Sequence, residues 1–95
     1  MGLERLRKKI DNVDRKIIKH IAKRTKIVRK IGEYKKKHKI PVHLPQREKQ
    51  ALKSRKGFAK KQKINPEMIE DIFKRLVKES HKIENDIKKG NSRKK

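Results

Sequence analysis

The sequence predicts an all-α protein of three helices, of which the first is very long, the second short and the third of medium length. Apolar residues recur every three or four positions over Leu3–Tyr34 and again over Met68–Ile87, the spacing of helices packed against other helices. Pro41, Pro45 and Pro66 lie between these stretches and divide the chain. Helices joined by proline-containing turns are therefore the expected architecture.

The first helix is expected from about Leu3 to about Lys37, with Gly32 tolerated inside it. At ~1.5 Å per residue it is roughly 50 Å long. A compact chain of 95 residues has a radius of gyration of about 12 Å, so this helix extends beyond its own domain. Its apolar stripe needs another subunit to cover it, and the sequence predicts a helical dimer or a larger assembly.

The segment from Pro41 to Pro45 ends the first helix and turns the chain. Pro45 suits the first position of a short second helix, because proline there needs no amide partner. This helix is expected from about Gln46 to about Lys56 or a little beyond, with Gly57 as its end or as a kink.

Asn65-Pro66-Glu67 predicts the start of the third helix, because a capping residue is followed by proline and an acid in the first turn. Its apolar positions continue to Ile87. We therefore expect one helical domain over residues 1–89 and a disordered basic tail over residues 90–95.

Composition limits the class of protein. Only 31% of residues are hydrophobic and 3% aromatic, so a monomer has little core, and the net charge is +22. The absence of cysteine excludes disulfides and thiolate metal sites and fits a reducing cytoplasm. No apolar run approaches membrane-spanning length, and Met-Gly-Leu-Glu-Arg lacks the apolar segment of a signal peptide. A cytoplasmic protein without membrane association is expected.

Polar side chains interrupt the apolar faces of both long helices. Arg24 occupies a position of the first stripe, and Lys35, eleven residues later, lies within about 20° of it around the helix axis. Ser80 takes a stripe position of the third helix, and Glu84 follows on the same face. Cations that face a helical core are costly unless a negative group meets them.

One explanation is structural, since an ion pair of Glu84 with Lys35 or Arg24 can fix the register of a bundle. The charges are unbalanced, however. Arg24, Lys35 and Arg47, near the start of the second helix, exceed what Glu84 and Glu48 can neutralise. A small anionic ligand supplies the missing charge.

Other kinds of site find no support in the sequence. It has no dinucleotide-binding glycine motif, no phosphate loop, no Ser-His-Asp arrangement and no cysteine nucleophile. Four histidines have no metal-ligand spacing and are expected on the surface or in loops: His20, His38, His43 and His81. No metal or cofactor is expected.

Short motifs in a fixed order match a known family. They are Arg7-Lys-Lys-Ile10-Asp-Asn-Val13-Asp14, Ile21-Ala22-Lys-Arg24, Ile31-Gly32-Glu-Tyr-Lys35, a turn with Pro41, Gln46-Arg47-Glu48, and Glu79-Ser80 with a polar residue four positions further on. From Arg7 to Glu84 the chain resembles the all-helical AroQ-class chorismate mutases. The resemblance implies an intertwined homodimer that isomerises chorismate to prephenate in aromatic amino acid biosynthesis (the shikimate pathway), without cofactor, metal or covalent intermediate.

The resemblance also implies roles for the cations. It places Arg7, Arg24 and Arg47 on the two substrate carboxylates, with Arg7 reaching the pocket of the partner subunit, and Lys35 on the ether oxygen. These residue types fit the chemistry, because a guanidinium binds a carboxylate through two parallel bonds and an ammonium is a point charge suited to one oxygen. A pericyclic reaction needs a compact substrate conformer and positive charge at the breaking C–O bond, rather than an acid or a base.

The remaining roles implied by the resemblance belong to uncharged or acidic groups. Glu48 is placed on the ring hydroxyl and Ser80 beside the substrate. Glu84 stands where most bacterial relatives have glutamine, as a second donor to the ether oxygen. Leu44 stands where the family usually has aspartate, so one polar contact near the ring hydroxyl is absent or replaced by backbone.

Two other functions stay open at this point. An isochorismate-pyruvate lyase of the same fold uses the same cations, and the sequence hardly separates it from a mutase. A basic helical nucleic-acid-binding protein is the other, since a net charge of +22 gives salt-dependent affinity for phosphates. Phosphate contacts belong on exposed faces rather than on apolar stripes, so a chorismate mutase is the preferred prediction, with non-specific nucleic-acid affinity as a side effect.

Overall fold

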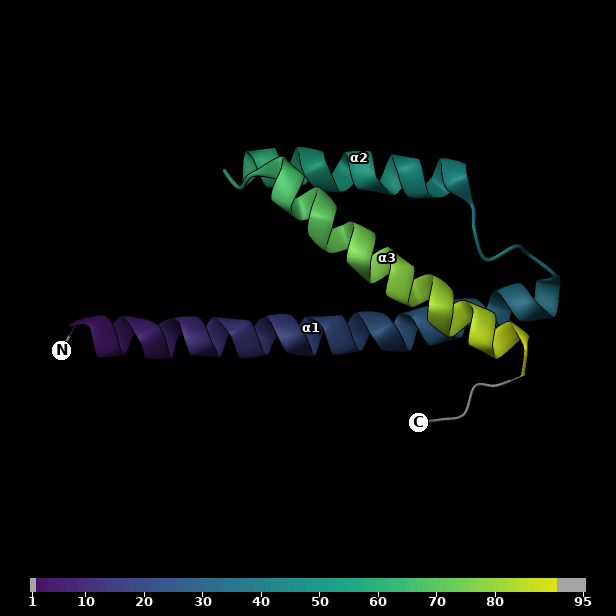
Figure 1. Ribbon diagram of the computed structural model, residues 1–95, viewed down its shortest axis with the longest axis horizontal. Helices are drawn as coiled ribbons and strands as arrows, with labels where there is room; N and C mark the ends of the chain where they lie inside the picture. Colours follow the sequence, from purple (N-terminus) through teal and green to yellow (C-terminus); the bar gives the residue numbers. More distant parts are fainter. Residues whose placement is uncertain (1, 91–95) are drawn as a thin grey trace.

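The computed structural model describes residues 2–90 and contains three α-helices. They are α1 over Gly2–His38, α2 over Pro45–Lys61 and α3 over Pro66–Lys88 (Figure 1). The described residues contain no strand, and the predicted all-α class and helix order are confirmed. Of the predicted tail, only Gly90 belongs to the described residues, and residues 91–95 lie outside them.

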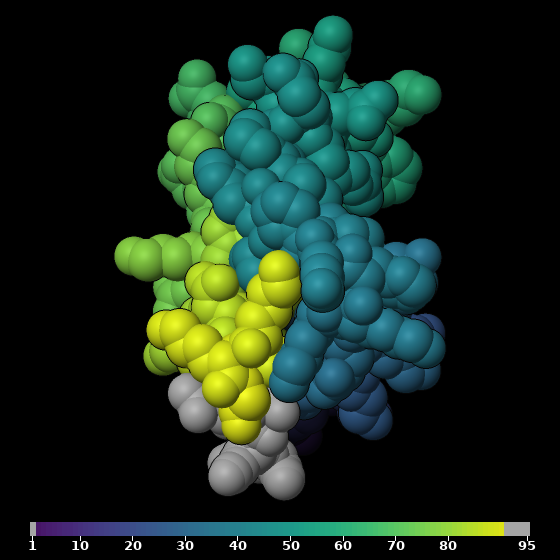
Figure 2. All heavy atoms as spheres, turned by 90° about the vertical axis from the view of Figure 1, so that its right-hand side faces the viewer, coloured from purple at the N-terminus to yellow at the C-terminus, as the bar shows by residue number. Residues whose placement is uncertain are grey.

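The helix α3 connects the other two. It crosses between α1 and α2 and packs against both, whereas α1 and α2 make no contact with each other within residues 2–90 (Figure 1). At its end α3 lies against the segment that joins α1 to α2 (Figure 2), where the Lys88 ammonium donates to the Ile40 carbonyl. These contacts hold the end of α3 and the connecting segment together at one end of α1.

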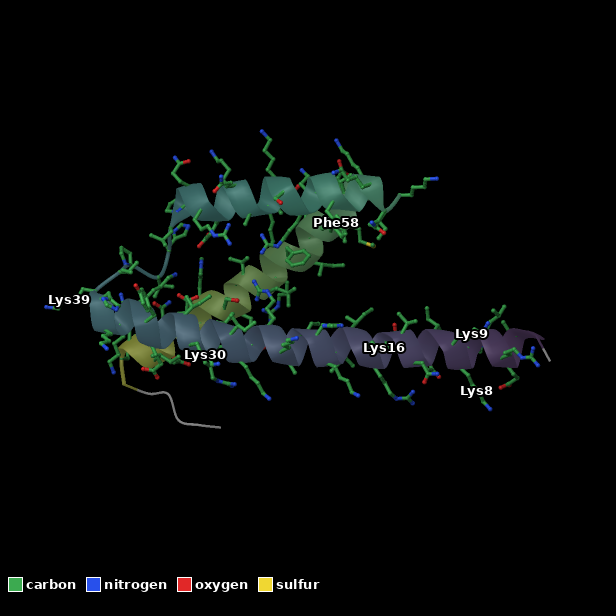
Figure 3. All side chains as sticks on the ribbon, turned by 180° about the vertical axis from the view of Figure 1, so that it is seen from behind. Lys8, Lys9, Lys16, Lys30, Lys39 and Phe58 are labelled. Atoms are coloured by element: carbon green, nitrogen blue, oxygen red, sulfur yellow. The ribbon has the colours of Figure 1, made fainter. Side chains whose placement is uncertain are left out.

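The other half of α1 projects from the molecule. Figure 3, seen from behind, shows this half, with Lys8, Lys9 and Lys16 labelled, extending beyond the ends of α2 and α3. The radius of gyration is 16.5 Å and the longest dimension 55 Å, against about 12 Å for the radius of gyration of a compact chain of this length. The overhang predicted for the first helix is confirmed.

The core of the single chain is very small. Val28, Ala59 and Ile87 are its buried apolar residues within the described range. The other large apolar side chains of α1 are exposed, with exposed fractions of 37–65%. They are Leu3, Leu6, Ile10, Val13, Ile17, Ile18, Ile21, Ile27, Ile31 and Tyr34.

The face of α1 that meets α3 is displaced by one residue from part of the predicted stripe. Val28 and Gly32 are buried, whereas Ile27 and Ile31 are exposed. A β-carbon at Gly32 would lie 2.9 Å from Cδ1 of Ile87 and 3.4 Å from Cα of Glu84. The close approach of α3 to α1 therefore requires a glycine at this position, because any side chain would meet Ile87 and Glu84.

The second helix is longer than the sequence predicts. It begins at Pro45 and passes Gly57 without ending, reaching Lys61. Ala59 lies in this extension and is 4% exposed. Because α2 packs only against α3 within the described chain, burial of this alanine holds the last turn in helical form.

Polar interactions fix the start of α3 and its contact with α2. Oδ1 of Asn65 accepts the backbone N–H of Glu67 at 2.9 Å, as the predicted start signal requires. The Lys56 ammonium of α2 donates to Oε1 of Glu70 in α3 at 2.7 Å. Hydrogen bonds from Lys56 and Lys74, and then their charges, lower the pKa of Glu70 to about 2.

Candidate active site

A cavity of about 560 Å³, a size typical of sites for small molecules, is lined by residues of all three helices. Its walls come from the second half of α1, the connecting segment, α2 and α3. Six of the seven predicted site residues line it, namely Arg24, Lys35, Arg47, Glu48, Ser80 and Glu84. The predicted seam between the two long helices is therefore the wall of a pocket.

Arg7 is not among the lining residues. It is exposed and lies in the projecting half of α1, seventeen residues from Arg24. This separation corresponds to about 25 Å along the helix. Arg7 cannot reach the pocket of its own chain.

Arg24 is held by the opposite wall of the pocket. Its Nη1 donates to Oγ of Ser80 at 2.7 Å, and the Ser80 hydroxyl donates in turn to the Leu76 carbonyl at 2.9 Å. Burial lowers the pKa of Arg24, the charge of Arg55 lowers it further, and Glu84 opposes this shift. Arg24 forms no ion pair within residues 2–90, so its charge is available to an anion.

Lys35 of α1 and Glu84 of α3 also face each other in the pocket. Nζ of Lys35 lies 2.8 Å from Oε1 of Glu84, and the side chains are only 13% and 7% exposed. The ammonium donates to the Val42 carbonyl at 2.9 Å, whereas the buried Oε1 accepts no well-aligned hydrogen bond from the described residues. The ion pair considered above as a structural explanation is present, and it neutralises Lys35 but not Arg24.

Glu48 meets two histidines. Its Oε2 lies 2.6 Å from Nε2 of His81, which is half-buried in α3 and lines the pocket. Its Oε1 lies 3.3 Å from Nε2 of His43, an exposed residue of the connecting segment. The expectation of a surface or loop position describes His43 but is wrong for His81. No local pattern signals this contact, since Glu48 and His81 are 33 residues apart.

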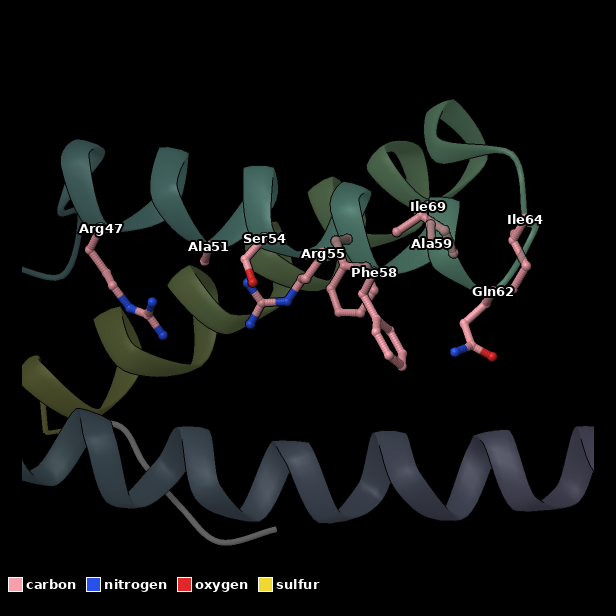
Figure 4. A pocket seen from close by; sticks show the side chains of 10 residues that line it. Arg47, Ala51, Ser54, Arg55, Phe58, Ala59, Gln62, Ile64 and Ile69 are labelled. Atoms are coloured by element: carbon pink, nitrogen blue, oxygen red, sulfur yellow. The ribbon is translucent and has the colours of Figure 1, made fainter.

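Arg55 is a further cation of the pocket that the sequence reasoning missed. It extends from α2 on the same side as Arg47 (Figure 4). Its guanidinium carbon lies 5.1 Å from the centre of the Phe73 ring, and burial, followed by the charge of Arg47, lowers its pKa. Arg55 follows Arg47 by eight residues, about 80° around the helix axis, so helix periodicity alone does not place both side chains in one pocket.

The charges of the pocket do not balance. Cations from all three helices line it: Arg24, Lys35, Arg47, Lys49, Arg55 and Lys74. The carboxylates among the lining residues are Glu48 and Glu84, and Lys74 has a partner in Glu70. The three arginines remain without a carboxylate partner among the described residues, which suits the pocket to a small anion with more than one carboxylate.

Two further findings concern residues 2–90 as a whole. They contain no group of three His, Asp or Glu side chains placed to hold a metal ion. None of the helices described is long and apolar enough to cross a bilayer.

Comparison with known proteins places these features in a family. The profile "Chorismate mutase type II" matches residues 6–85. The T-protein of Enterobacter agglomerans is 38% identical over 84 residues, which are 88% of this chain and 22% of that protein. The chorismate mutase of Methanocaldococcus jannaschii is 30% identical over 82 residues, or 86% of this chain and 83% of its own length.

A bifunctional chorismate mutase/prephenate dehydratase of Aquifex aeolicus is 35% identical over 71 residues, which are 75% of this chain and 18% of that enzyme. The chain thus spans less than a quarter of the T-proteins that it matches. No solved structure matches it at a significant level.

The matched residues 6–85 contain Arg7 and all six predicted residues that line the pocket. They also cover most of the chain and reach into each of the three helices. The chain belongs to the type II chorismate mutase family.

Proposed function

We propose that this chain is a chorismate mutase that isomerises chorismate to prephenate. The observation that carries the proposal is the pocket in which Arg24, Arg47 and Arg55 have no carboxylate partner among residues 2–90. Chorismate is a small dianion, and its two carboxylates are the kind of group that these unpaired guanidinium groups bind. Family membership gives independent support.

The proposed mechanism is electrostatic. Arg24 and Arg47 bind the carboxylates and hold the flexible dianion in its compact reactive conformer, which removes much of the entropic barrier. Lys35 stabilises the negative charge that develops on the ether oxygen as the C–O bond breaks. Ser80 supports the process from the wall, because its hydroxyl fixes the Arg24 guanidinium at 2.7 Å.

Glu48 and Glu84 have opposite roles in this proposal. Glu48 accepts a hydrogen bond from the ring hydroxyl, since a carboxylate is an acceptor only. Glu84 lies beside Lys35. In this proposal it acts as a second donor to the ether oxygen, which requires that its carboxyl group is protonated. The reaction then needs no covalent intermediate on the protein.

We further propose that the active unit is an intertwined homodimer in which Arg7 of the partner completes each pocket. The exposed apolar stripe of α1 supports this, because residues 2–90 of the single chain do not cover it. A second cavity of about 580 Å³ supplies a matching apolar surface on α2 and α3 (Figure 4). Its apolar lining is Ala51, Phe58, Ala59, Ile64, Ile69 and Phe73.

The test is turnover by the purified chain. Chorismate should disappear, as followed by its absorbance, and prephenate should be the identified product. Lys35→Met should abolish the reaction, while Lys30→Met, an exposed lysine of the same helix, should not. Isochorismate is the second substrate to be tested. Release of pyruvate from isochorismate, with no conversion of chorismate, would show a lyase and contradict the proposal.

A further inference from the structure

The Glu48 carboxylate is held between two histidines that come from different parts of the chain. His81 of α3 contacts Oε2 at 2.6 Å, and His43 of the connecting segment contacts Oε1 at 3.3 Å. The two rings lie 5.2 Å apart and are tilted by 57°. Both oxygens of Glu48 therefore have a partner that α2 itself does not provide.

The short contact determines where the proton lies. An ionised carboxylate only accepts hydrogen bonds, so Nε2 of His81 must carry a hydrogen for a contact of 2.6 Å to be favourable. The carboxylate keeps free lone pairs for a ligand hydroxyl. Since the side chains of His81 and Glu48 are each 28% exposed, the bond is partly shielded from water and restricts the orientation of Glu48.

The charge of Glu48 is the next consideration. The charge of Glu84 is offset by Lys35 at 2.8 Å. Within residues 2–90, no lysine or arginine lies at ion-pair distance from Glu48. Histidine is the side chain whose charge changes between about pH 5 and 8. Exposed His43 at Oε1 of Glu48 is the second histidine here. The cations that line the pocket are arginines and lysines, which keep one charge over this range: Arg24 and Lys35 of α1, Arg47, Lys49 and Arg55 of α2, and Lys74 of α3.

Leu44 makes the chain more dependent on Glu48. This residue lines the pocket from the N-cap of α2 and its side chain forms no capping bond. An aliphatic side chain cannot accept a hydrogen bond from a ligand. At this end of the pocket Glu48 is therefore the acceptor side chain. Its orientation depends on the two histidines, and so does the net charge of the group that they form with it.

We propose that His81 is a positioning residue that orients Glu48 toward the hydroxyl of a small dianion and, when protonated, cancels the repulsion between Glu48 and that dianion. This inference rests on the proposed function. Neutral His81 leaves a full negative charge beside an incoming dianion, whereas the imidazolium removes it. Substrate binding should therefore tighten as the pH falls through the range in which histidine titrates.

The first experiment measures KM and kcat for chorismate between pH 5.5 and 8.5. In the unmodified protein KM should rise about threefold to tenfold across this range, the order expected for one nearby charge in a solvated site. His81→Gln keeps an N–H donor for Glu48 without a titrating charge, so its KM should be nearly constant while kcat stays within about twofold. His81→Leu should also lose the pH dependence and in addition lose several-fold in kcat.

The control is His38→Gln, because His38 is exposed at the end of α1 beside Tyr34 and does not line the pocket. It should reproduce the unmodified KM profile. If KM of His81→Gln depends on pH as it does in the unmodified protein, the proposal is overturned. The measurements are repeated in His43→Gln, where the rise of KM with pH should persist, which separates His81 from the exposed histidine at the other oxygen of Glu48.

A second experiment does not depend on turnover. The ¹⁵N spectrum of the imidazole rings at pH 8 should show His81 with its proton on Nε2, whereas exposed His38 should show the mixture of tautomers of a free ring. A proton on Nδ1 of His81 would overturn the proposal even in an active enzyme. If chorismate is not converted at all, the proposed function fails, and this spectrum still reports on the contact between His81 and Glu48.

Discussion

Lys35 and Glu84 form an ion pair of 2.8 Å in the wall of the pocket, and the carboxylate oxygen in this pair has no well-aligned hydrogen-bond donor among the described residues. The pair joins α1 to α3 at the place where the proposed reaction needs two donors for one ether oxygen. As a carboxylate, Glu84 stabilises Lys35 but repels the charge that develops in the reaction. As a carboxylic acid it donates. The protonation of Glu84 should therefore control the rate.

Glu84→Gln is the first predicted change. In the unmodified protein kcat should fall as the pH rises, because the donating form of Glu84 is the protonated one. Glutamine donates at any pH, so the variant should have a flat profile and a higher kcat near neutrality. A profile of kcat against pH that is identical in both proteins would show that Glu84 is only the structural partner of Lys35.

Leu44→Asp is expected to act on both function and stability. Aspartate at the N-cap should stabilise α2 by about 1 kcal/mol, because its side chain can accept a free N–H of the first turn. It should also raise kcat/KM by a modest factor, on the order of 1 kcal/mol, through a bond to the ring hydroxyl. Leu44→Asn is the matched control for the gain in stability, because asparagine caps a helix about as well as aspartate. Equal kcat/KM in the aspartate variant and in the unmodified protein, with the gain in stability present, would refute the contact with substrate.

Gly32→Ala and Gly57→Ala should have opposite effects on stability. Alanine at the exposed Gly57 meets nothing within 4 Å and should raise the free energy of unfolding by about 0.5–1 kcal/mol. At Gly32 the same methyl group would lie 2.9 Å from Cδ1 of buried Ile87. Overpacking there should outweigh the gain in helix propensity and lower the free energy of unfolding by about 1 kcal/mol. Urea unfolding of both variants measures this, and a stabilised Gly32→Ala would mean that α3 moves away at little cost.

Arg55→Leu tests the additional arginine. We expect a roughly tenfold higher KM for chorismate with a smaller change in kcat, since a partly desolvated cation near both Arg24 and Arg47 is lost. Arg75→Leu removes an arginine that is paired with Glu79 outside the pocket and serves as the control. If both variants raise KM equally, net charge rather than the position of Arg55 is responsible.

The sequence was sufficient for the helices and for much of the pocket. Periodicity located both long helices, and the eleven-residue spacing of Arg24 and Lys35 correctly placed them on one wall. What it could not provide depends on contacts between distant segments. The burial of Ala59 extends α2 beyond Gly57, and the contact between Glu48 and His81 joins residues 33 apart.

The most direct test concerns the pocket that two subunits share. Arg7→Ala and Arg24→Ala should each be nearly inactive on chorismate. When equal amounts are mixed and refolded, half of the dimers should be mixed, and each mixed dimer should have one intact pocket. About a quarter of the unmodified activity should then return.

Arg24→Ala mixed with Lys35→Ala is the matched control, because both residues belong to the same chain's pocket and every site in the mixed dimer retains one defect. This mixture should recover nothing. The account predicts recovery of about a quarter of the activity with Arg7→Ala and none with Lys35→Ala. No recovery with Arg7→Ala, although subunit exchange is demonstrated, or equal recovery in both mixtures, would contradict it.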